Sequence, residues 1–400
     1  MLLWSSQVVS TFGAHAAGII YPLLILAMTG SPAQASLATV LRIVPYLLLS
    51  LPVGALIDRW DRRRVMITCH LGRALAVLSL PLAMALNALT VEHIFTVAIL
   101  EGALHVFFNI AETAALPRVV AKEDLPQATA HNQVGFAVAG IAGPALGTWL
   151  YQAVWRGMPF VADVATHLVG AAALWRLRTS FVPTAPTTKP NLRAEVAEGL
   201  RWLWGQRLVR DMALLTSGLN FVQAATPLML IVLAKQLGAD DAQVGLVFSL
   251  GGLGAIAGAF VCASIQRRFS FGQVIMGTLV MQALVFPIYL LCPGPLWLGA
   301  VYAAVMFFGP VYNVVQFSYR IGLIPDGLQG RVNSSYRLIC FGFNPLAAGL
   351  CGLVLEHWGT TPAVLLFGGV HVALALAAVL NRRVRTAPRQ HAAHEVPPTP

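Results

Sequence analysis

The sequence has very little charge. Its 400 residues include 16 Asp and Glu and 26 Lys and Arg, so that 10% are charged, against roughly 25% in an ordinary soluble domain. Hydrophobic residues make up 57% of the chain. A soluble chain of this length could not bury so much apolar surface in one core. The composition therefore excludes a soluble globular protein.

Charged residues are missing altogether from seven long stretches of the chain. Each stretch is long enough for one transmembrane helix of about 20 residues, and the longest hold two. Only helices and closed barrels satisfy their backbone hydrogen bonds within lipid, and these stretches lack the alternating pattern of barrel strands. The sequence therefore predicts an all-α membrane protein. The uncharged stretches are 1–41, 125–155, 212–234, 242–266, 269–319, 338–355 and 357–381.

Signatures of metal and nucleotide chemistry are also scarce. The five cysteines are scattered and no pair has the spacing of metal ligands, so we expect membrane thiols and no metal site. No G-x-x-x-x-G-K-[S/T] loop occurs, which argues against an ATPase. No convergent catalytic constellation is visible either, so we expect neither an enzyme nor a cofactor.

The uncharged stretches and the turn residues between them predict twelve transmembrane helices in two sets of six. Residues 179–208 form the one long connection, so we expect an N-terminal bundle over 1–178 and a C-terminal bundle over 209–381. The predicted spans are 4–28, 33–57, 67–90, 94–116, 127–153, 158–178, 209–235, 242–265, 271–291, 296–318, 333–355 and 361–381.

The positive charges indicate the orientation. If the N-terminus is cytoplasmic, the loops on the cytoplasmic side and the C-terminal tail carry 22 of the 26 Lys and Arg residues. This asymmetry follows the positive-inside rule. Most of the net charge of +10 is therefore a consequence of topology, and we do not expect nucleic-acid binding. The exceptions are Arg156 and Lys235 on the opposite side, and Arg42 and Arg73 within spans.

The long connection and the C-terminal end are therefore expected in the cytoplasm. The Pro- and Thr-rich part of the connection is typical of a flexible linker. Val196, Leu200 and Leu203 recur at helical spacing, which predicts an amphipathic helix along the inner membrane surface. Residues 382–400 are expected to form a disordered tail, because the end of the chain is rich in Pro, His and Ala.

The two halves of the chain repeat a short pattern at equivalent places. The segment GALIDRWDRRR after the second span aligns with GAFVCASIQRR after the eighth, so that Gly54 matches Gly258. Asp58 matches Cys262, so the acid is present in the first copy only. Parallel repeats of this kind imply two halves related by an axis along the membrane normal, with a transport site near the midplane.

The same segment resembles a known family. GALIDRWDRRR is similar to the loop between spans two and three of the major facilitator superfamily, G-x-L-x-D-R-x-G-R-R/K, with Asp61 in place of the usual Gly. AGIAGPALG in span five resembles the antiporter motif of exporters in that superfamily, and FVADVATHLVG resembles its macrolide-efflux and enterobactin-exporter branch. The matching residues are Gly54, Asp58, Arg59, Arg62 and Arg63 in the loop, and Gly143, Pro144 and Gly147 in span five.

The resemblance covers nearly the whole chain and implies the major facilitator fold, with two pseudo-symmetric six-helix bundles. It implies a secondary transporter of a bacterial inner membrane that exports a small amphipathic organic molecule in exchange for protons, by alternating access. We expect a monomer whose partners are that molecule, protons and lipid. Members usually carry charged residues before span one, and none precede it here, so an earlier natural start is expected.

Two kinds of alternative stay open. Within the same fold, the chain could be a dedicated exporter of a siderophore or secondary metabolite, or a lysophospholipid flippase. A non-transporting membrane sensor or enzyme belongs to a different class, and it is disfavoured because the cytoplasmic parts are too short for a signalling domain.

The loop after span two supplies the candidates for a conformational switch. By resemblance, contacts of Asp58 with the start of span eleven hold the outward-facing state, and a helix N-terminus favours an anion. Arg62 could pair with an acid at the cytoplasmic end of span four, for which Glu112 is the candidate. A solvated positive-inside loop is the alternative for the arginines. The candidates are Gly54, Asp58, Arg59, Arg62, Arg63 and Glu112.

Ionisable residues inside spans are costly and mark functional sites by default. Glu101 and His105 share one face of span four, which by resemblance lines the central cavity. Arg42 lies at a similar depth in span two, so we expect it to pair with Glu101, either for proton coupling or as a structural ion pair. His15 in span one is the fourth candidate for proton coupling, with packing as the alternative. For Asp163 in span six we expect a structural role.

Neutral polar residues in spans seven and ten are the candidates for the substrate cavity. They recur along one face of each span, and Gly309-Pro310 is expected to break span ten. Such stripes also occur as hydrogen-bonding seams between helices, which is the alternative. A cavity with few fixed charges suits a bulky amphipathic or apolar substrate. The candidates are Asn220, Gln223, Tyr302, Met306, Asn313 and Gln316.

Small residues predict close contacts between helices. Ala139, Gly143 and Gly147 form a small face in span five. Gly254 and Gly258 form another in span eight. By resemblance, these two helices meet across the two halves.

Overall fold

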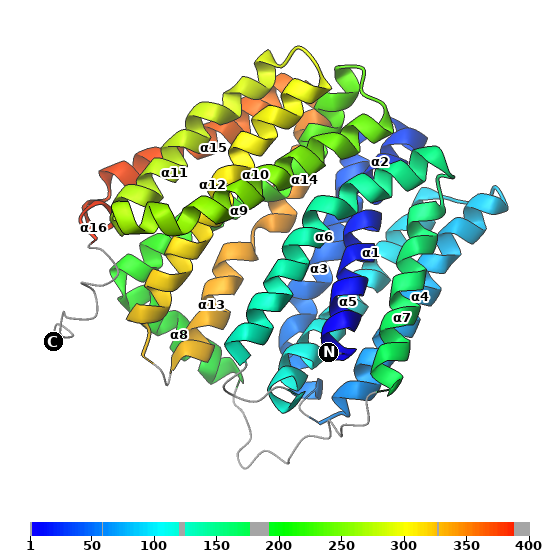
Figure 1. Cartoon of the computed structure of the whole chain (residues 1–400), viewed down its shortest axis with the longest axis horizontal. Coiled ribbons are helices and arrows are strands. Elements are labelled where there is room, and N and C mark those ends of the chain that lie inside the picture. The colour runs from blue at the N-terminus through cyan, green and yellow to red at the C-terminus, as the bar shows by residue number, and fades with distance from the viewer. Residues whose placement is uncertain (1, 58, 120–124, 177–191, 326–327, 388–400) are drawn as a thin grey trace. The chain divides into compact units, whose positions relative to one another are not determined.

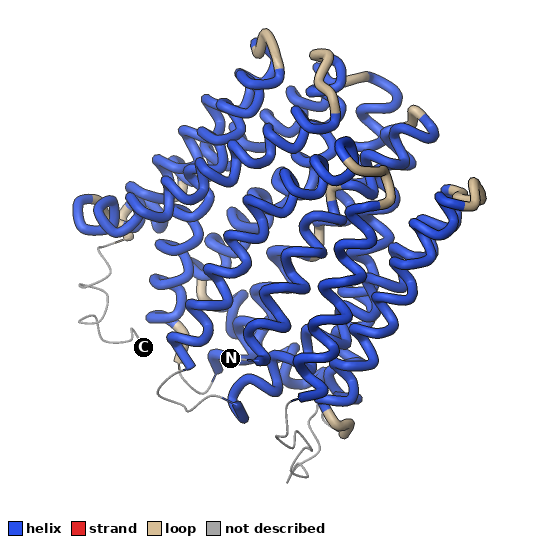
Figure 2. Tube along the Cα trace, turned by 45° about the vertical axis from the view of Figure 1, so that its right-hand side comes forward, coloured by secondary structure: helices blue, strands red, loops and turns tan. Residues whose placement is uncertain are grey.

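The structure, a computed structural model, describes residues 2–57, 59–119, 125–176, 192–325 and 328–387. Every regular element in these ranges is a helix, and no strand occurs among them (Figure 2). The predicted all-α class is confirmed.

The described chain divides into two compact units, and the first contains the helices up to residue 176 (Figure 1). Residues Ala239–Ser249 also belong to the first unit. Helix α10 (Asp241–Arg268) therefore begins in the first unit and continues in the second. The other helices of the first unit are α1 (Leu2–Gly18), α2 (Ile20–Thr29), α3 (Pro32–Ile57), α4 (Arg62–Ala85), α5 (Val91–Val119), α6 (Leu125–Ala153) and α7 (Met158–Arg176).

The second unit contains the helices from residue 192 onward, apart from the start of α10. One of its elements is a 3₁₀ helix, η2. The elements besides α10 are α8 (Leu192–Gly205), α9 (Arg207–Gln236), α11 (Phe271–Val285), η2 (Phe286–Leu291), α12 (Pro295–Leu323), α13 (Gln329–Phe341), α14 (Asn344–Trp358), α15 (Thr360–Leu380) and α16 (Arg382–Arg385).

Both units use the same scheme of helix packing. In the first unit, α1 packs against α6 and α7, and α4 packs against α5 and α7. In the second unit, α9 packs against α14 and α15, and α11 packs against α12 and α15. In terms of the predicted spans, the pairs 1·5, 1·6, 3·4 and 3·6 of the first half recur as 7·11, 7·12, 9·10 and 9·12. The packing therefore agrees with an internal repeat.

The observed helices coincide with the predicted spans. Eleven helical segments of the described chain are long and apolar enough to cross a membrane. The remaining predicted span, 127–153, coincides with α6. Twelve membrane-crossing helices are therefore consistent with the structure.

Two of the spans are divided in a way that the sequence analysis did not predict. Span one is interrupted at Ile19, between α1 and α2. Pro22 has no N–H to donate to the carbonyl of Gly18, where α1 ends. Span eleven is divided in the same way, because Pro345 lies four residues after Phe341, the last residue of α13.

The break that was expected at Gly309-Pro310 is wrong. Helix α12 runs without interruption from Pro295 to Leu323, with Pro310 inside it. A proline in a transmembrane helix frees one backbone carbonyl, and neighbouring groups can satisfy it. Span nine instead changes its geometry, because α11 gives way to the 3₁₀ helix η2 one residue before Pro287.

Asp61, which replaces the usual Gly of the loop motif, begins α4. Its Oδ1 accepts hydrogen bonds from the backbone N–H of Arg63 at 2.9 Å and of Arg64 at 3.4 Å. Such an N-cap satisfies backbone donors that the first turn of a helix leaves free. Capping of α4 therefore explains the aspartate at this position.

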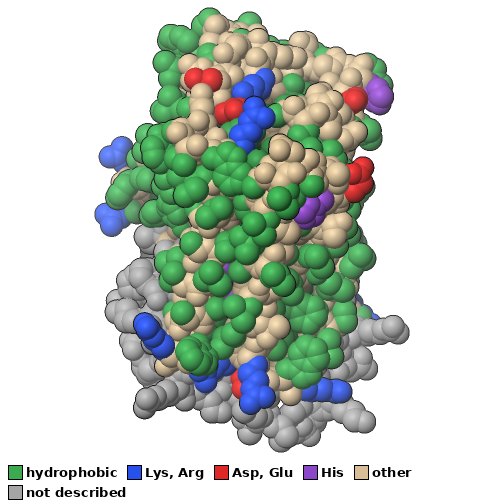
Figure 3. Space-filling view, turned by 90° about the vertical axis from the view of Figure 1, so that its right-hand side faces the viewer, with side chains coloured by type: hydrophobic (Ala, Val, Ile, Leu, Met, Phe, Trp, Pro, Cys, Tyr) green, Lys and Arg blue, Asp and Glu red, His purple; other side chains and the backbone are tan. Residues whose placement is uncertain are grey.

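Large hydrophobic side chains are exposed along the helices. Leu75, Leu86 and Trp175 are 73%, 77% and 76% exposed. On the face drawn in Figure 3, hydrophobic side chains cover much of the described surface. Broad apolar surface of this kind suits contact with lipid and not with water. The chain is therefore a multi-pass membrane protein.

A helix is present in the long connection, as expected. This helix, α8, packs against α9 and α13, and Leu203 is buried beside Tyr336 and Cys340. At the other end, α16 begins at residue 382 and Val384 is buried. The chain thus stays folded past the residue at which a disordered tail was expected to begin. Residues 388–400 lie outside the described residues.

Candidate functional site

A buried carboxylate in the first unit accepts hydrogen bonds from three side chains. Glu101 in α5 is 1% exposed. Its Oε1 accepts from Nη2 of Arg42 in α3 at 3.1 Å and from Nη2 of Arg73 in α4 at 2.9 Å. Its Oε2 accepts from the hydroxyl of Tyr21 in α2 at 3.0 Å. Four helices therefore meet on one carboxylate, and Tyr21, Arg42, Arg73 and Glu101 are called the ion cluster below.

Two glycines and the break in span one allow these side chains to meet. A Cβ at Gly102 would lie 2.2 Å from the carbonyl oxygen of Arg42, so α3 and α5 can approach this closely only at a glycine. A Cβ at Gly18 would lie 3.0 Å from Nη1 of Arg42. Helix α2, which follows the break in span one, carries Tyr21. The guanidinium carbon of Arg42 lies 5.6 Å from the centre of the Tyr21 ring.

A second buried acid lies in α7. Asp163 and His167 are one helical turn apart and are both 0% exposed. Nε2 of His167 lies 3.6 Å from Oδ1 of Asp163, and Nδ1 of His167 lies 3.1 Å from Nδ1 of His70 in α4. Thr166 donates its hydroxyl proton to the main-chain carbonyl of Asp163 at 2.7 Å. Asp163, His167 and His70 are called the acid–histidine chain below.

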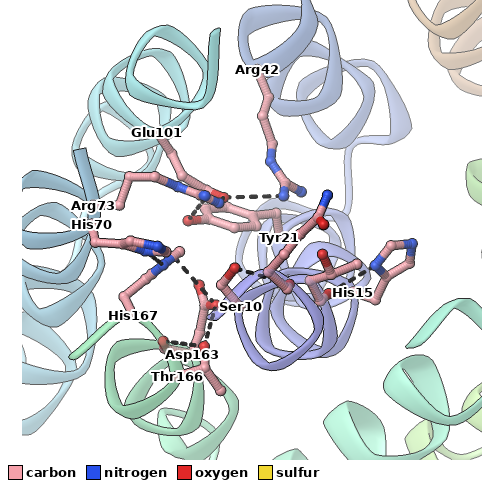
Figure 4. Close-up of polar contacts among 12 residues, drawn as sticks. Ser10, His15, Tyr21, Arg42, His70, Arg73, Glu101, Asp163, Thr166 and His167 are labelled. Atoms are coloured by element: carbon pink, nitrogen blue, oxygen red, sulfur yellow. Dashed lines mark hydrogen bonds and ion pairs between the residues drawn. The ribbon is translucent and has the colours of Figure 1, made fainter. Parts of the chain in front are cut away.

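The two acids differ in coordination, as Figure 4 shows. Both carboxylate oxygens of Glu101 accept hydrogen bonds. Oδ2 of Asp163 is buried and has no hydrogen-bond partner among the described residues. Helix α1 leaves room for this carboxylate, since a Cβ at Gly13 would lie 2.6 Å from Oδ1 of Asp163. Helix α4 links the two groups because it carries both Arg73 and His70.

The expected pair of Arg42 and Glu101 is confirmed. The sequence did not indicate Arg73 or Tyr21 as further partners, although Arg73 is the only Asp, Glu, Lys or Arg of the third predicted span. His105, one helical turn after Glu101 in α5, is exposed, whereas Glu101 is buried. The roles of these residues in proton coupling stay predictions.

His15 packs beside the small face of α6. Its Nδ1 lies 2.9 Å from the carbonyl oxygen of Thr11. A Cβ at Gly143 would lie 2.7 Å from Cβ of His15, and a Cβ at Gly147 would lie 2.1 Å from the carbonyl oxygen of Ala16. The glycines of the antiporter motif therefore pack against α1 of the same unit.

Span eight meets span five next to these glycines. A Cβ at Gly245 in α10 would lie 1.7 Å from Oγ1 of Thr148, so the contact is made by the residue after Gly147. The small face of span eight instead packs against α12. There, a Cβ at Gly254 or Gly258 would lie 2.0 Å from a carbonyl oxygen of that helix.

The arginines of the loop after span two bind the ends of neighbouring helices. Arg63 donates through Nε to the carbonyl of Leu174 at 2.9 Å and through Nη2 to the carbonyl of Trp175. These carbonyls belong to the last turn of α7, where a cation is favourable. Asp58 lies outside the described residues, so its contact with span eleven stays a prediction.

Arg62 reaches α5 at a different point from the one expected. Its Nη1 donates to the carbonyl of Ala114 at 2.8 Å. Glu112 is 5% exposed, and its pairing with Arg62 stays a prediction. Arg59 is exposed, and a Cβ at Gly54 would meet nothing within 4 Å. Packing in this structure therefore does not explain the glycine at position 54.

The cavity candidates of the second unit are only partly brought together. Nε2 of Gln316 donates to the hydroxyl of Tyr336, and Nδ2 of Asn220 donates to the carbonyl of Cys340 at 3.0 Å. Both contacts join one helix to another, as the alternative explanation of the stripes expects. Gln223, Tyr302 and Met306 are half-buried, and Asn313 is exposed.

A buried aromatic group around Tyr336 was missed by the sequence analysis. Its hydroxyl lies 2.9 Å from Oγ1 of Thr216, which lies 3.0 Å from the hydroxyl of Tyr312. The guanidinium carbon of Arg320 lies 3.7 Å from the centre of the Tyr336 ring. This group joins α9, α12 and α13. No periodic pattern in the sequence indicates it, since one residue comes from α9, two from α12 and one from α13.

The described residues contain no group of three His, Cys, Asp or Glu side chains that could hold a metal ion. All five cysteines are buried thiols. The chemistry that the first unit offers is therefore that of buried charges and protons, in a protein built of membrane-crossing helices.

Comparison with known proteins identifies the family. Residues 3–343 match the Major Facilitator Superfamily. The chain belongs to this superfamily. It is therefore a transporter with the major facilitator fold.

Several exporters are similar to this superfamily member in sequence. The multidrug efflux pump Tap of Mycolicibacterium fortuitum is 24% identical over 385 residues, which cover 92% of this chain and 91% of Tap. The enterobactin exporter EntS of Salmonella typhimurium is also 24% identical over 385 residues, which cover 93% of this chain and 90% of EntS.

Solved structures share the fold. A bacterial homologue of the iron transporter ferroportin, in an inward-facing state, has a TM-score of 0.70 at 15% identity. The match covers 94% of this chain and 98% of the homologue. The nucleoside transporter NupG has a TM-score of 0.72 at 14% identity and covers the same shares. These likenesses confirm the fold that the sequence resemblance implied.

Proposed function

We propose that the protein is a proton-coupled exporter of a small amphipathic organic molecule, such as an antibiotic or another drug-like compound. The two six-helix bundles, 1–178 and 209–381, alternate access to a site between them. The protein works as a monomer in a bacterial inner membrane, with both termini in the cytoplasm.

The observation that carries the proposal is the set of buried charges in the first unit. The carboxylate of Glu101 forms ion pairs with both Arg42 and Arg73. Asp163 interacts electrostatically with the same two arginines. Charge in the membrane interior is costly and is retained where a transport cycle uses it. A transporter that keeps two acids and two arginines inside one bundle has the groups that proton coupling requires.

The direction of transport is supported by two features. Tap and EntS, which are named as an efflux pump and an exporter, match over more than nine-tenths of this chain. The segment AGIAGPALG of span five, with Gly143, Pro144 and Gly147, also resembles the antiporter motif of exporters in this superfamily.

The remaining cavity candidates suit a substrate with little charge. Gln223, Tyr302, Met306 and Asn313 are neutral side chains, of which Asn313 is exposed and the others are half-buried, and few fixed charges suit a ligand of this kind. Asn220 and Gln316 are bonded to neighbouring helices and act as positioning residues. The conformational switch is assigned to Gly54, Asp58, Arg59, Arg62, Arg63 and Glu112.

Export of a siderophore is the second candidate, because the sequence is as similar to the enterobactin exporter EntS as to Tap. The two candidates predict different substrates for the same mechanism, so one experiment separates them.

The test is the accumulation of a panel of antibiotics, ethidium and enterobactin in cells with and without the protein, each with and without an uncoupler. We expect lower accumulation of at least one drug-like compound, restored by the uncoupler. Lower accumulation of enterobactin alone supports the second candidate. If no compound changes, or if the uncoupler has no effect, proton-coupled export is refuted.

A further inference from the structure

We propose that Asp163 is the group that binds the coupling proton, and that His167 and His70 relay this proton. The proposal rests on proton-coupled export as the function. The sequence suggested Glu101 as a group for proton coupling. In this proposal the ion cluster, with Glu101 in it, instead keeps a constant charge that an ionised Asp163 balances.

Glu101 is unsuited to releasing and binding a proton in each cycle. Its Oε1 accepts from two guanidinium groups and its Oε2 from the hydroxyl of Tyr21. Protonation would remove the negative charge that Arg42 and Arg73 share, and Arg73 is 3% exposed. A buried cation without its partner is strongly unfavourable. Glu101 therefore stays ionised in this arrangement.

The surroundings of Asp163 offer far fewer hydrogen-bond donors to stabilise a permanent negative charge. Oδ1 lies 3.6 Å from Nε2 of His167 and 3.5 Å from a Thr166 hydroxyl whose proton is given to a main-chain carbonyl. Oδ2 has no hydrogen-bond partner among the described residues and is buried. A buried carboxylate normally accepts several hydrogen bonds. With one oxygen lacking a donor in the described part of the chain, the carboxyl group of Asp163 can take up a proton without losing a hydrogen bond that supports its charge.

The ionised form of Asp163 is supported in a different way, by the charge of the ion cluster. Arg42 and Arg73 carry two positive charges and Glu101 one negative charge, so the cluster has one positive charge left over. An ionised Asp163 balances this positive charge. A protonated Asp163 is neutral, so that no buried carboxylate is left short of hydrogen bonds. Each protonation state is thus stabilised by one feature of the surroundings, which is what a group that cycles between them needs.

The two histidines give the proton a way to and from Asp163. Nδ1 of His167 and Nδ1 of His70 lie 3.1 Å apart, so one of them donates and the other accepts. When Nδ1 of His167 accepts, its Nε2 carries the proton and faces Oδ1 of Asp163. Transfer of the Nδ1 proton of His70 to Nδ1 of His167, with loss of the Nε2 proton of His167 to Asp163, therefore moves one proton from α4 to α7 and leaves His167 in the other tautomer.

The proton step is balanced without any other reactant. A proton that has reached the buried His70 is passed from its Nδ1 to Nδ1 of His167 while the N–H bond at Nε2 of His167 breaks; an O–H bond forms at Asp163, and the carboxylate loses its charge. Release breaks that O–H bond and returns the proton to water on the opposite side of the membrane. No bond between heavier atoms is made or broken.

The second half of the repeat shows that packing does not require an acid here. With the sequence offset that matches Gly54 to Gly258, His167 falls on His371 in α15, whose Nε2 lies 3.3 Å from Oε1 of Gln282 in α11. The residue one turn before His371 is Phe367, where the first half has Asp163. The same pair of helices is thus joined by neutral groups, and His371 supplies a matched control.

Other charged or titratable groups surround Asp163 and are part of the proposal. Helix α1 contributes Gly13 and Ser10 at this point, and its His15 lies beside α6 (Figure 4). The side chain of His131 in α6 lies outside those described. The groups on the facing helices are Tyr21, Arg42, His70, Arg73, Glu101 and His105, with His167 on the same helix.

The first test observes the proton directly by infrared difference spectroscopy of the purified protein between two pH values. We expect a band of a buried protonated carboxyl group that shifts when aspartate, and not glutamate, is labelled with ¹³C. The band is lost in Asp163→Asn and kept in His371→Gln. Because labelling is done on the wild-type protein, the test holds even where Asp163→Asn fails to fold. A band that follows labelled glutamate, or that survives in Asp163→Asn, overturns the proposal.

The second test separates this proposal from the proposed function. Proteoliposomes with the full chain are assayed for accumulation of ethidium driven by an acidic lumen, and for exchange of ethidium across the membrane at equal pH. Asp163→Asn should exchange ethidium but gain nothing from the pH gradient, while His371→Gln behaves as the wild type. A gradient response in Asp163→Asn equal to that of the wild type refutes the proton role of Asp163. Failure of the wild type to respond refutes proton-coupled export of this probe, while the infrared band still decides on Asp163.

Discussion

Glu101 and Asp163 show how two acids of one bundle acquire different properties from their contacts. Depth in the membrane was enough to predict that Arg42 pairs with Glu101. Arg73 and Tyr21 could not be predicted, because their contact depends on how α4 packs beside α5 and on where span one breaks. Sequence position reports the depth of a side chain but not the neighbour it faces.

The ion cluster predicts a large loss of stability when its carboxylate is neutralised. Glu101→Gln keeps the shape of the side chain and leaves two arginines without a counter-charge, which should lower the free energy of unfolding by about 3–5 kcal/mol. Tyr21→Phe removes one hydrogen bond to the same carboxylate and should cost about 1.5–3 kcal/mol.

Equilibrium unfolding in mixed micelles measures both losses. Asn313→Ser, an exposed polar position in α12, serves as the control and should change little. A Glu101→Gln variant as stable as the wild type would show that the three donors do not depend on the charge of Glu101.

At the scale of the helix, the sequence predicts where a span lies better than whether it is continuous. Pro22 and Pro345 coincide with breaks, whereas Pro144, Pro227 and Pro310 lie inside unbroken helices. A proline always removes one donor, but whether the helix breaks depends on what satisfies the freed carbonyl. That information is in the neighbouring helices, so composition alone cannot supply it.

The contact between α1 and α6 predicts different outcomes for two glycines of one helix. In Gly147→Ala the new Cβ would lie 2.1 Å from the carbonyl oxygen of Ala16, so the helices must separate. We expect a cost of about 1–3 kcal/mol and a clear loss of transport. In Gly140→Ala the nearest atoms belong to the His15 ring at 3.9 Å, which is an ordinary contact.

Thermal unfolding in detergent and ethidium accumulation compare these two variants. Gly140→Ala should be neutral or slightly stabilising, since alanine favours a helix over glycine by about 1 kcal/mol. Equal behaviour of the two variants would contradict the close packing of α6 on α1.

Helix α8 is attached to α13 by close contact more than by charge. A Cβ at Gly199 would lie 2.5 Å from the carbonyl oxygen of Arg331. The ion pair of Glu198 with Arg331, at 2.6 Å, joins side chains that are 48% and 40% exposed, and such pairs contribute about 0–1 kcal/mol. Gly199→Ala should therefore speed hydrogen exchange in α8, and Glu198→Gln should not. If only Glu198→Gln exchanged faster, the ion pair and not the close contact at Gly199 would hold α8 on α13.

At the scale of the whole molecule, composition and charge placement were sufficient for the fold class. Long uncharged stretches predicted helices in lipid, and the repeated segments around Gly54 and Gly258 predicted two similar halves. The packing of the two units repeats accordingly. The partners of individual glycines were not predictable, since Gly143 and Gly147 face α1 within their own unit.

The positive-inside pattern predicts which loops meet the cytoplasm. A cysteine at Ala88, exposed between α4 and α5, should react with a membrane-impermeant maleimide in intact cells. A cysteine at Phe269, 49% exposed after α10, should react only in inverted vesicles. The natural cysteines are buried and give a low background. Labelling of both positions from the same side would contradict the topology.

Proton-coupled export is the central claim, and the most direct test is the stoichiometric movement of protons with a substrate. In proteoliposomes with an acidic lumen and a trapped pH dye, addition of ethidium outside should raise the luminal pH while ethidium accumulates, and a sodium gradient should not replace the pH gradient. Accumulation of ethidium with no change in luminal pH would contradict the account.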